Sequence, residues 1–197
     1  MKRVQKRTHE TEKRILREAA RLFQVNGYEN TSIDAVAEQA DVAKGTVFAH
    51  FGDKVNLLAA VNAIELDELV AITQAKAETG AKGTPVDDVL ALYDPWLDFF
   101  ARNDAFAKLF INQAGLSAGP WTERFIQACC TLEKAVEALI EDWRERRMPP
   151  SQKTATFLAE GAQAFFFNAV IYRLSGRTPD DQSQRSSLKA FLSAWFE

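Results

Sequence analysis

The stretch Thr31–Lys54, TSIDAVAEQADVAKGTVFAHFGDK, predicts two short helices joined by a tight turn. Thr31 is a helix-capping residue type, and Asp34 three positions later completes a typical helix-start signal. Asp41 lies in the turn, where aspartate accepts the left-handed conformation better than most residues. The second helix is expected to start at Lys44. Helices this short need a neighbouring helix for stability, and such a pair suits a surface that enters the DNA major groove.

The composition is that of an ordinary folded chain with one basic end. Of the 197 residues 47% are hydrophobic, and no window is apolar enough for a membrane span. Residues 1–21 carry eight basic and three acidic side chains, whereas the rest of the chain carries 16 basic and 24 acidic ones. This asymmetry favours a polyanion bound at the basic end, although a solvated basic tail explains the same charges. No signal peptide is recognisable, so we expect a cytoplasmic protein.

Helical periodicity extends along the whole chain. No stretch alternates with period two, so the expected fold class is all-α with about nine helices. The first helix is expected at about residues 8–26, ended by Gly27 in a left-handed conformation, while residues 1–8 are expected to be frayed. One helix at residues 53–78, capped by Asp53, is expected to link two parts of the chain.

A Gly/Pro-rich break, TGAKGTP at residues 79–85, marks the predicted domain boundary. We expect a helix–turn–helix domain at residues 1–52, extended by the linking helix, and a second domain at residues 79–197. Pro95 should kink or restart the helix in which it lies.

The last two helices have apolar residues on more than one face. They are expected at about residues 154–174, with Ser151 as the cap, and at residues 185–196. The segment SGRTPDDQS between them is expected to be a loop.

The N-terminal segment resembles the DNA-binding domain of TetR-family transcriptional regulators. The matching residues are RILREAARLFQVNGYENTSIDAVAEQADVAKGTVFAHFGDKVNLLAAV. The resemblance depends on features that coincide in order: Gly27-Tyr28, Thr31-Ser32, Lys44-Gly45-Thr46, and His50-Phe51 followed by Lys54. The rest of the chain matches only in length and helical character.

This resemblance implies an all-helical homodimer. The family's N-terminal domain reads operator double-stranded DNA, and its C-terminal domain holds a small-molecule pocket and the dimer interface. In this chain the interface would be formed by the last two helices. A two-fold dimer also follows from DNA geometry, since one short helix reads too few base pairs for useful specificity.

Three departures from the family pattern reduce the expected contacts with DNA. Asp41 replaces the usual glycine, Ala43 the usual serine or threonine, and Phe48 the usual tyrosine. Ala43 and Phe48 therefore lack hydroxyl groups that could reach DNA, and a neutral hydrogen bond contributes about 1 kcal/mol net. We expect weaker binding that depends on the basic residues 2–7 and falls steeply with salt.

The predicted DNA-binding residues fall into three groups. Those at the start of the second short helix would read bases, those at helix ends would meet phosphate, and those at the chain start would follow the backbone or enter the minor groove. The alternatives are a solvated helix, a purely capping role for Thr31, and a disordered tail. The candidates are Lys2, Arg3, Lys6, Arg7, Thr31, Ser32, Lys44, Gly45, Thr46, Phe48, Ala49, His50 and Lys54.

The predicted ligand pocket is formed by aromatic residues of the second domain and a few amides among them. Three consecutive phenylalanines, at residues 165–167, cannot all face one core because successive helical residues turn by about 100°. Some aromatic residues would then line a cavity or an interface, and the ligand would be mainly apolar. The alternative is a simple core with interhelical hydrogen bonds. The pocket candidates are Trp96, Phe99, Phe100, Phe106, Phe110, Gln113, Trp121, Phe125, Gln163, Phe166, Phe167 and Asn168.

No catalytic constellation is recognisable, so we do not expect an enzyme. Both histidines lie in the DNA-binding end, and no metal or cofactor motif is present. The adjacent Cys129 and Cys130 point to different helix faces and are expected to act as small buried hydrophobes.

The expected function is a DNA-binding regulator, in most such proteins a repressor released by a ligand. Ligand binding would change the spacing of the two recognition helices through the helix at residues 53–78. The alternative is a protein-partner binding module that uses the same fold.

Overall fold

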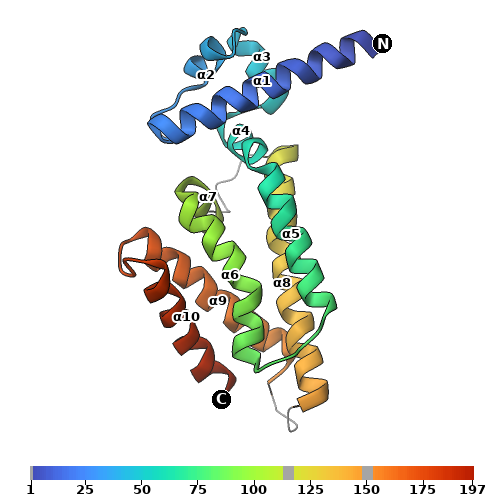
Figure 1. Ribbon diagram of the computed structural model, residues 1–197, viewed down its shortest axis with the longest axis vertical. Helices are drawn as coiled ribbons and strands as arrows, with labels where there is room; N and C mark the ends of the chain where they lie inside the picture. Colours follow the sequence, from blue (N-terminus) through green and yellow to red (C-terminus); the bar gives the residue numbers. More distant parts are fainter. Residues whose placement is uncertain (1, 113–117, 148–152) are drawn as a thin grey trace. The chain divides into compact units, whose positions relative to one another are not determined.

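Ten helices form the described part of the chain, which in this computed structural model comprises residues 2–112, 118–147 and 153–197 (Figure 1). The helices are α1 (Lys2–Asn26), α2 (Ile33–Gln39), α3 (Lys44–Phe51), α4 (Lys54–Val61), α5 (Ala63–Glu78), α6 (Pro85–Arg102), α7 (Asp104–Ile111), α8 (Pro120–Arg147), α9 (Ala155–Leu174) and α10 (Asp181–Phe196). Within these three ranges there is no strand, which confirms the all-α class. None of the helices described is long and apolar enough to cross a membrane.

The chain divides into two compact units. Unit 1 comprises residues 1–66 and 115–126, and unit 2 comprises residues 67–114 and 127–197. Helices α5 and α8 each start in unit 1 and continue into unit 2.

Unit 1 has a closed apolar core beneath α2 and α3. The buried members of this core are Ile15, Ala19, Leu22, Val36, Ala37, Ala40, Val47, Phe51, Leu57 and Ala60. Gly27 ends α1 with a φ of 79°, and the Tyr28 ring packs back onto Phe23 with ring centroids 5.3 Å apart. The predicted left-handed helix end is therefore confirmed, and α1 provides the neighbour that the two short helices require.

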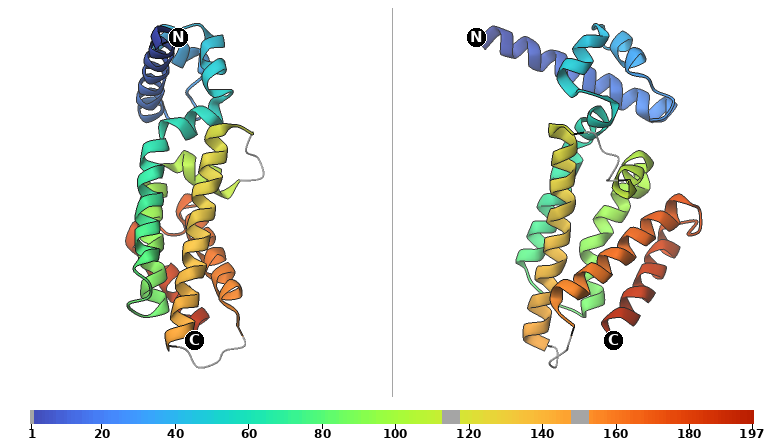
Figure 2. Two further views of the ribbon diagram at one scale, coloured as in Figure 1. Left: turned by 90° about the vertical axis from the view of Figure 1, so that its right-hand side faces the viewer. Right: turned by 180° about the vertical axis from the view of Figure 1, so that it is seen from behind.

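Unit 2 is organised around α6. This helix packs against α7, α9 and α10, and α9 and α10 lie side by side (Figure 2). Thr84 caps α6 by accepting a hydrogen bond from the amide of Asp87, and Pro85 occupies the first turn, where its missing N–H costs nothing. The helix runs without interruption through Pro95, so the expectation of a restart there was wrong.

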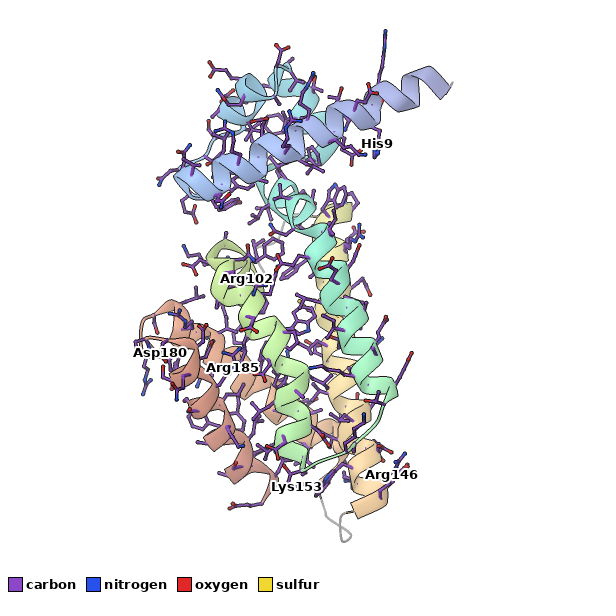
Figure 3. The ribbon with its side chains drawn as sticks, viewed as in Figure 1. His9, Arg102, Arg146, Lys153, Asp180 and Arg185 are labelled. Atoms are coloured by element: carbon purple, nitrogen blue, oxygen red, sulfur yellow. The ribbon has the colours of Figure 1, made fainter. Side chains whose placement is uncertain are left out.

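Ion pairs join α10 to α6. Arg185 projects from α10 (Figure 3), and its guanidinium donates to Asp94 at 3.0 Å and also to Asp98. Asp94 and Asp98 are four residues apart and therefore lie on one face of α6. At the crossing of α9 and α10, Gly161 lies directly against the indole of Trp195.

Two expected boundaries in unit 1 were wrong. Helix α1 starts at Lys2 and not near Thr8, so residues 2–8 continue the helix. The single helix expected at residues 53–78 is two helices, because Asn62 leaves the helical conformation and its side-chain amide donates to the carbonyl of Leu58 at 2.9 Å. Asparagine competes with the backbone for hydrogen bonds in this way, and the break explains why ten helices are present where about nine were expected.

Two caps in unit 2 also differ from expectation. Thr154 caps α9 by accepting from the amide of Phe157 at 3.1 Å, whereas Ser151 lies outside the described residues. Helix α10 starts at Asp181, four residues earlier than expected. Asp180 and Ser183 form a reciprocal capping box there, which the predicted loop had concealed.

Candidate nucleic-acid interface

The start of α2 is capped by Ser32 and not by Thr31. The Ser32 hydroxyl accepts a hydrogen bond from the amide of Ala35 at 3.1 Å. Thr31 is only 1% exposed, and its hydroxyl donates to the carbonyls of Gly27 at 2.8 Å and Leu22 at 3.2 Å. Thr31 therefore ties the end of α1 to the start of α2, and we withdraw the expectation that its hydroxyl meets phosphate.

The turn between α2 and α3 depends on Asp41. This residue has a φ of 50°, and within the described residues it is the one non-glycine residue with a positive φ. The turn is closed by the amide of Val42, which donates to the carbonyl of Ala37 at 3.0 Å. Arg14 of α1 reaches the same turn, where its Nη2 donates to the carbonyl of Asp41 at 3.4 Å. These contacts set the direction in which α3 leaves the turn.

Helix α3 presents one face to the core and another to solvent. Val47 and Phe51 are 1% and 3% exposed, which confirms their predicted inward orientation. The opposite side of the helix is formed by the exposed residues Lys44, Gly45, Phe48 and Ala49, with Thr46 and His50 half-buried beside them. The structure thus brings the six base- and phosphate-contact candidates of α3 together on one short helix, eight residues long, that rests on a closed core.

Gly45 and Phe48 give the exposed side of α3 its shape. A Cβ added at Gly45 would meet nothing within 4 Å, so the backbone itself forms the surface there. Phe48 is 42% exposed and presents an apolar edge in place of a hydroxyl. Ala43 precedes α3 without making a side-chain cap bond.

The two lysines of the helix–turn–helix segment have different partners. Lys44 forms an ion pair with Asp34 of α2, with Nζ and Oδ2 2.8 Å apart. Lys54 donates to the carbonyl of Glu29 at 3.2 Å and lies 4.3 Å from the ring centre of Tyr28. Burial, followed by the charges of nearby carboxylates, raises the pKa of Tyr28 to about 12, so this ring stays a neutral cation–π partner.

Residues 2–7 start α1 as a helix. Arg7 is exposed, while the side chains of Lys2, Arg3 and Lys6 lie outside the described part of the structure. An α-helix is about 10–12 Å across and the minor groove about 6 Å wide. A whole helix is therefore too wide to enter the minor groove, and contact of residues 2–7 with phosphate or with the minor groove stays a prediction.

The aromatic residues predicted to line a pocket form a closed core in this structure. In unit 2, Trp96, Phe99, Phe106 and Phe166 are fully buried and Phe100 is 2% exposed. Phe125 belongs to unit 1 and is 1% exposed there. The Tyr93 and Phe166 rings stack at 4.3 Å, and the Phe99 and Phe106 rings meet edge to face at 5.2 Å. A side chain that lined a space large enough for water would keep some accessible surface, so each of these six residues packs as core in its own unit.

The other pocket candidates are dispersed. Trp121 belongs to unit 1, where its ring lies 6.3 Å from that of Phe51. Gln163 accepts a hydrogen bond from the hydroxyl of Tyr93 at 3.2 Å and lines a surface hollow of about 390 Å³ between α8 and α9. Phe167 and Asn168 are half-buried. Gln113 and the side chain of Phe110 lie outside the described residues.

Two residues that shape this segment are not among the predicted site residues. Asp34 was predicted only as part of a helix-start signal, and Arg14 is only one of the eight basic residues counted in residues 1–21. A charge opposite to Lys44 on the preceding helix was the available signal for Asp34. Nothing in the sequence indicated that Arg14 would reach a backbone carbonyl 27 residues away.

Comparisons with known proteins agree with this geometry. Residues 15–61 match the family model of bacterial regulatory proteins, tetR family. The chain is 41% identical over 76 residues to the HTH-type transcriptional repressor KstR of Mycolicibacterium smegmatis, covering 39% of this chain and 36% of that protein. It is 35% identical over 69 residues to the HTH-type transcriptional regulator TcmR of Streptomyces glaucescens, covering 34% and 30%. The matches thus span about a third of the length of these relatives.

Solved structures extend the likeness to the whole fold. The chain superimposes on Thermus thermophilus FadR, a TetR-family transcriptional repressor in complex with lauroyl-CoA, with a TM-score of 0.68 and 20% identity over 94% of this chain and 93% of that one. Bacillus subtilis FadR, in complex with stearoyl-CoA, gives a TM-score of 0.65 and 14% identity over 91% and 97%. The helix–turn–helix geometry, the family model and the relatives all coincide in one N-terminal segment, and this segment is similar to the tetR family of bacterial regulatory proteins.

Proposed function

We propose that this chain is a dimeric transcriptional regulator that binds operator double-stranded DNA through α3. The observation that carries the proposal is the exposed side of α3, held on a closed core by the Asp41 turn and Arg14. In a helix–turn–helix the second helix enters the major groove while the first crosses the backbone. Lys44 and Thr46 are the polar base-reading groups, and His50, Lys54 and Ser32 are the phosphate-facing ones.

Repression is the proposed direction of regulation. The relatives that share the N-terminal segment include proteins named as transcriptional repressors. A repressor needs only to occupy its operator, and the base and phosphate contacts proposed above would supply that occupancy.

The dimer is proposed to form through α9 and α10. An aromatic patch (Phe157, Phe165, Phe191 and Trp195) covers these helices, and Phe157 and Phe191 are 47% and 39% exposed. The Phe165 and Phe191 rings stack at 5.4 Å, and the Phe157 and Trp195 rings lie 5.2 Å apart. Exposed small residues lie on the same helices, which would let a partner's helices approach closely. These are Ala164, Ala190 and Ala194.

The proposed effector is a mainly apolar small molecule taken up by unit 2. The aromatic core is closed in this structure, so ligand entry would require these rings to move apart, and binding would favour a different population of conformers. The helices at residues 53–78 would carry the change, with Asn62 as the point where α4 and α5 can reorient. Lauroyl-CoA and stearoyl-CoA are the first probes to test, because two structures of this fold hold them.

The decisive experiment is in vitro selection of duplex DNA from a random library with the full-length chain. The expected result is a pair of inverted half-sites about one helical turn apart or a multiple of it. Affinity for the selected duplex should fall steeply with salt, and Lys44→Met, His50→Ala and Lys54→Met should each weaken it. Addition of lauroyl-CoA or stearoyl-CoA then tests release.

The alternative function is a protein-partner binding module built on the same fold. The selection experiment distinguishes this function from operator binding. Failure to enrich any duplex, together with salt-independent behaviour and no effect of the three substitutions, would favour a protein partner.

A further inference from the structure

We propose that Asp34 is a specificity-determining residue that holds Lys44 away from phosphate while leaving it able to contact a base. This inference rests on the proposed DNA-binding function and adds a role for an acidic residue inside the interface. The role is to weaken binding to DNA of any sequence more than binding to the operator.

The geometry of the pair is specific to these two helices. Asp34 lies in the first turn of α2, Lys44 is the first residue of α3, and their charged atoms are 2.8 Å apart. The Asp34 side chain is 66% exposed and the Lys44 side chain 53% exposed, so both face the solvent from which DNA would approach. The pair spans the turn that brings the first helix to the backbone and the second to the groove.

Lys44 and Lys54 differ in the charge of the groups that hold them. Lys54 is held by a neutral carbonyl and a neutral ring, so its positive charge remains available to a phosphate. Lys44 is held by a carboxylate, and the pair as a whole carries no net charge. Of these two lysines, Lys44 is therefore the one whose contribution to non-specific attraction is cancelled.

The cancellation affects phosphate and base contacts unequally. Non-specific binding comes from neutralising phosphates and releasing counterions, and a phosphate brought to Lys44 would also be brought to Asp34. A guanine edge offers neutral acceptor atoms, which a carboxylate does not repel in the same way. The Lys44 ammonium has three N–H donors, so it can keep Asp34 as a partner and still donate to a base. Asp34 thus raises the ratio of operator to non-specific affinity.

The test compares Asp34→Asn with Glu38→Gln in the full-length chain. Glu38 is exposed on the same helix, so its substitution removes one negative charge of the interface without releasing Lys44. The probe is a duplex of random sequence, with the selected operator as the second probe, titrated over a range of salt concentrations. Asp34→Asn should raise random-duplex affinity about two- to fivefold, the strength of an exposed ion pair. It should also steepen the salt dependence by about one counterion.

A double-mutant cycle with Lys44→Met isolates the pair. In the Lys44→Met background, the gain in random-duplex affinity from Asp34→Asn should shrink to the gain from Glu38→Gln. In every comparison, affinity for the operator should rise less than affinity for the random duplex. Equal effects of Asp34→Asn and Glu38→Gln, or a gain that persists without Lys44, would overturn the inference. A wild-type chain with no salt-dependent affinity for either duplex would instead reject the proposed function. Circular dichroism of each variant checks that the fold is retained.

Discussion

The side chain of Asn56 accepts two hydrogen bonds from Thr122, one from its backbone amide at 3.2 Å and one from its hydroxyl at 3.3 Å, although 66 residues separate the two. Both residues are 1% exposed. The Asn56 amide also donates to Asp53, the cap of α4, at 3.2 Å. One buried side chain therefore fixes the first turn of α8 against the helix that follows α3, all within unit 1.

Replacing Asn56 should destabilise unit 1. In Asn56→Ala the amide of Thr122 loses its buried partner, and an unsatisfied buried polar group costs about 1–3 kcal/mol. Thr122→Val is the matched control, since it removes only the hydroxyl and should cost about 1 kcal/mol. Urea unfolding followed by tryptophan fluorescence measures both, because Trp121 adjoins the site. Equal stability of Asn56→Ala and wild type would show that the network is dispensable.

Asp41 should tolerate glycine and reject a β-branched residue. Its φ of 50° is costly for most side chains, so Asp41→Gly is expected to raise the free energy of unfolding by up to about 1 kcal/mol. Asp41→Val should lower it by about 1–3 kcal/mol. Both substitutions remove the same negative charge, so the difference between them reports backbone conformation alone. Thermal unfolding of the two variants is the measurement, and a more stable Asp41→Val would contradict the assigned turn.

Gly161 and Gly45 should respond oppositely to alanine. Alanine in a helix interior normally stabilises by about 0.5–1 kcal/mol. At Gly161 the added methyl would overlap the Trp195 indole, whose N–H is tied to the carbonyl of Leu158 at 3.0 Å, so a loss of about 1–3 kcal/mol is expected. At Gly45 nothing lies within 4 Å, so stability should be kept or improved while DNA affinity falls. Recovery of stability in Gly161→Ala combined with Trp195→Leu would identify the ring as the obstacle.

The aromatic patch on α9 and α10 should control self-association. Phe157→Glu and Phe191→Glu place a charge where the proposed interface is apolar, and an unpaired buried charge costs about 3–5 kcal/mol. The dimer dissociation constant should therefore rise by about 100-fold or more. Ile72→Glu is the control, because Ile72 of α5 is also exposed, at 42%, but lies outside the patch. Analytical ultracentrifugation that finds both patch variants still dimeric would place the interface elsewhere.

The thiol of Cys129 should be unreactive until unit 2 unfolds. Cys129 is 3% exposed, and burial, assisted by the nearby Glu133 carboxylate, raises the pKa of its thiol well above the ordinary range. Since only the thiolate reacts, a Cys130→Ser variant should resist a thiol reagent at pH 8 in the folded state and react as denaturant is added. Reaction of folded Cys130→Ser at the rate of a free thiol would show that unit 2 opens readily.

The local signals in the sequence predicted the helix–turn–helix segment well, because these signals act over three or four residues. Gly27 ends α1, Asp53 caps α4 with its carboxylate 2.7 Å from the amide of Asn56, and Asp41 takes the left-handed conformation. The predicted start of a helix was wrong where two neighbouring residues were equally suitable as its cap. Thr31 and Ser32 are both capping residues, and only burial of the Thr31 hydroxyl under α1 decided that Ser32 caps α2.

The candidate pocket could not be predicted because periodicity marks a face as apolar without saying what fills the space against it. The periodicity around Phe166 fits a cavity-lining residue and a core residue equally well, and the Tyr93 ring stacked on it at 4.3 Å makes it a core residue. Trp121 lies in the aromatic part of the sequence but packs in unit 1 on Phe51. The segment from which a residue comes does not determine the core that it joins.

The sequence by itself determined the all-helical class, the helix–turn–helix segment and the resemblance of that segment to the tetR family, since each depends on short-range patterns. The tertiary structure decided which charges of that segment meet. Lys44 lies ten residues from Asp34 along the chain and 2.8 Å from it in space. The turn at Asp41 and the shared core of α2 and α3 bring the two side chains together, and no local propensity encodes that distance.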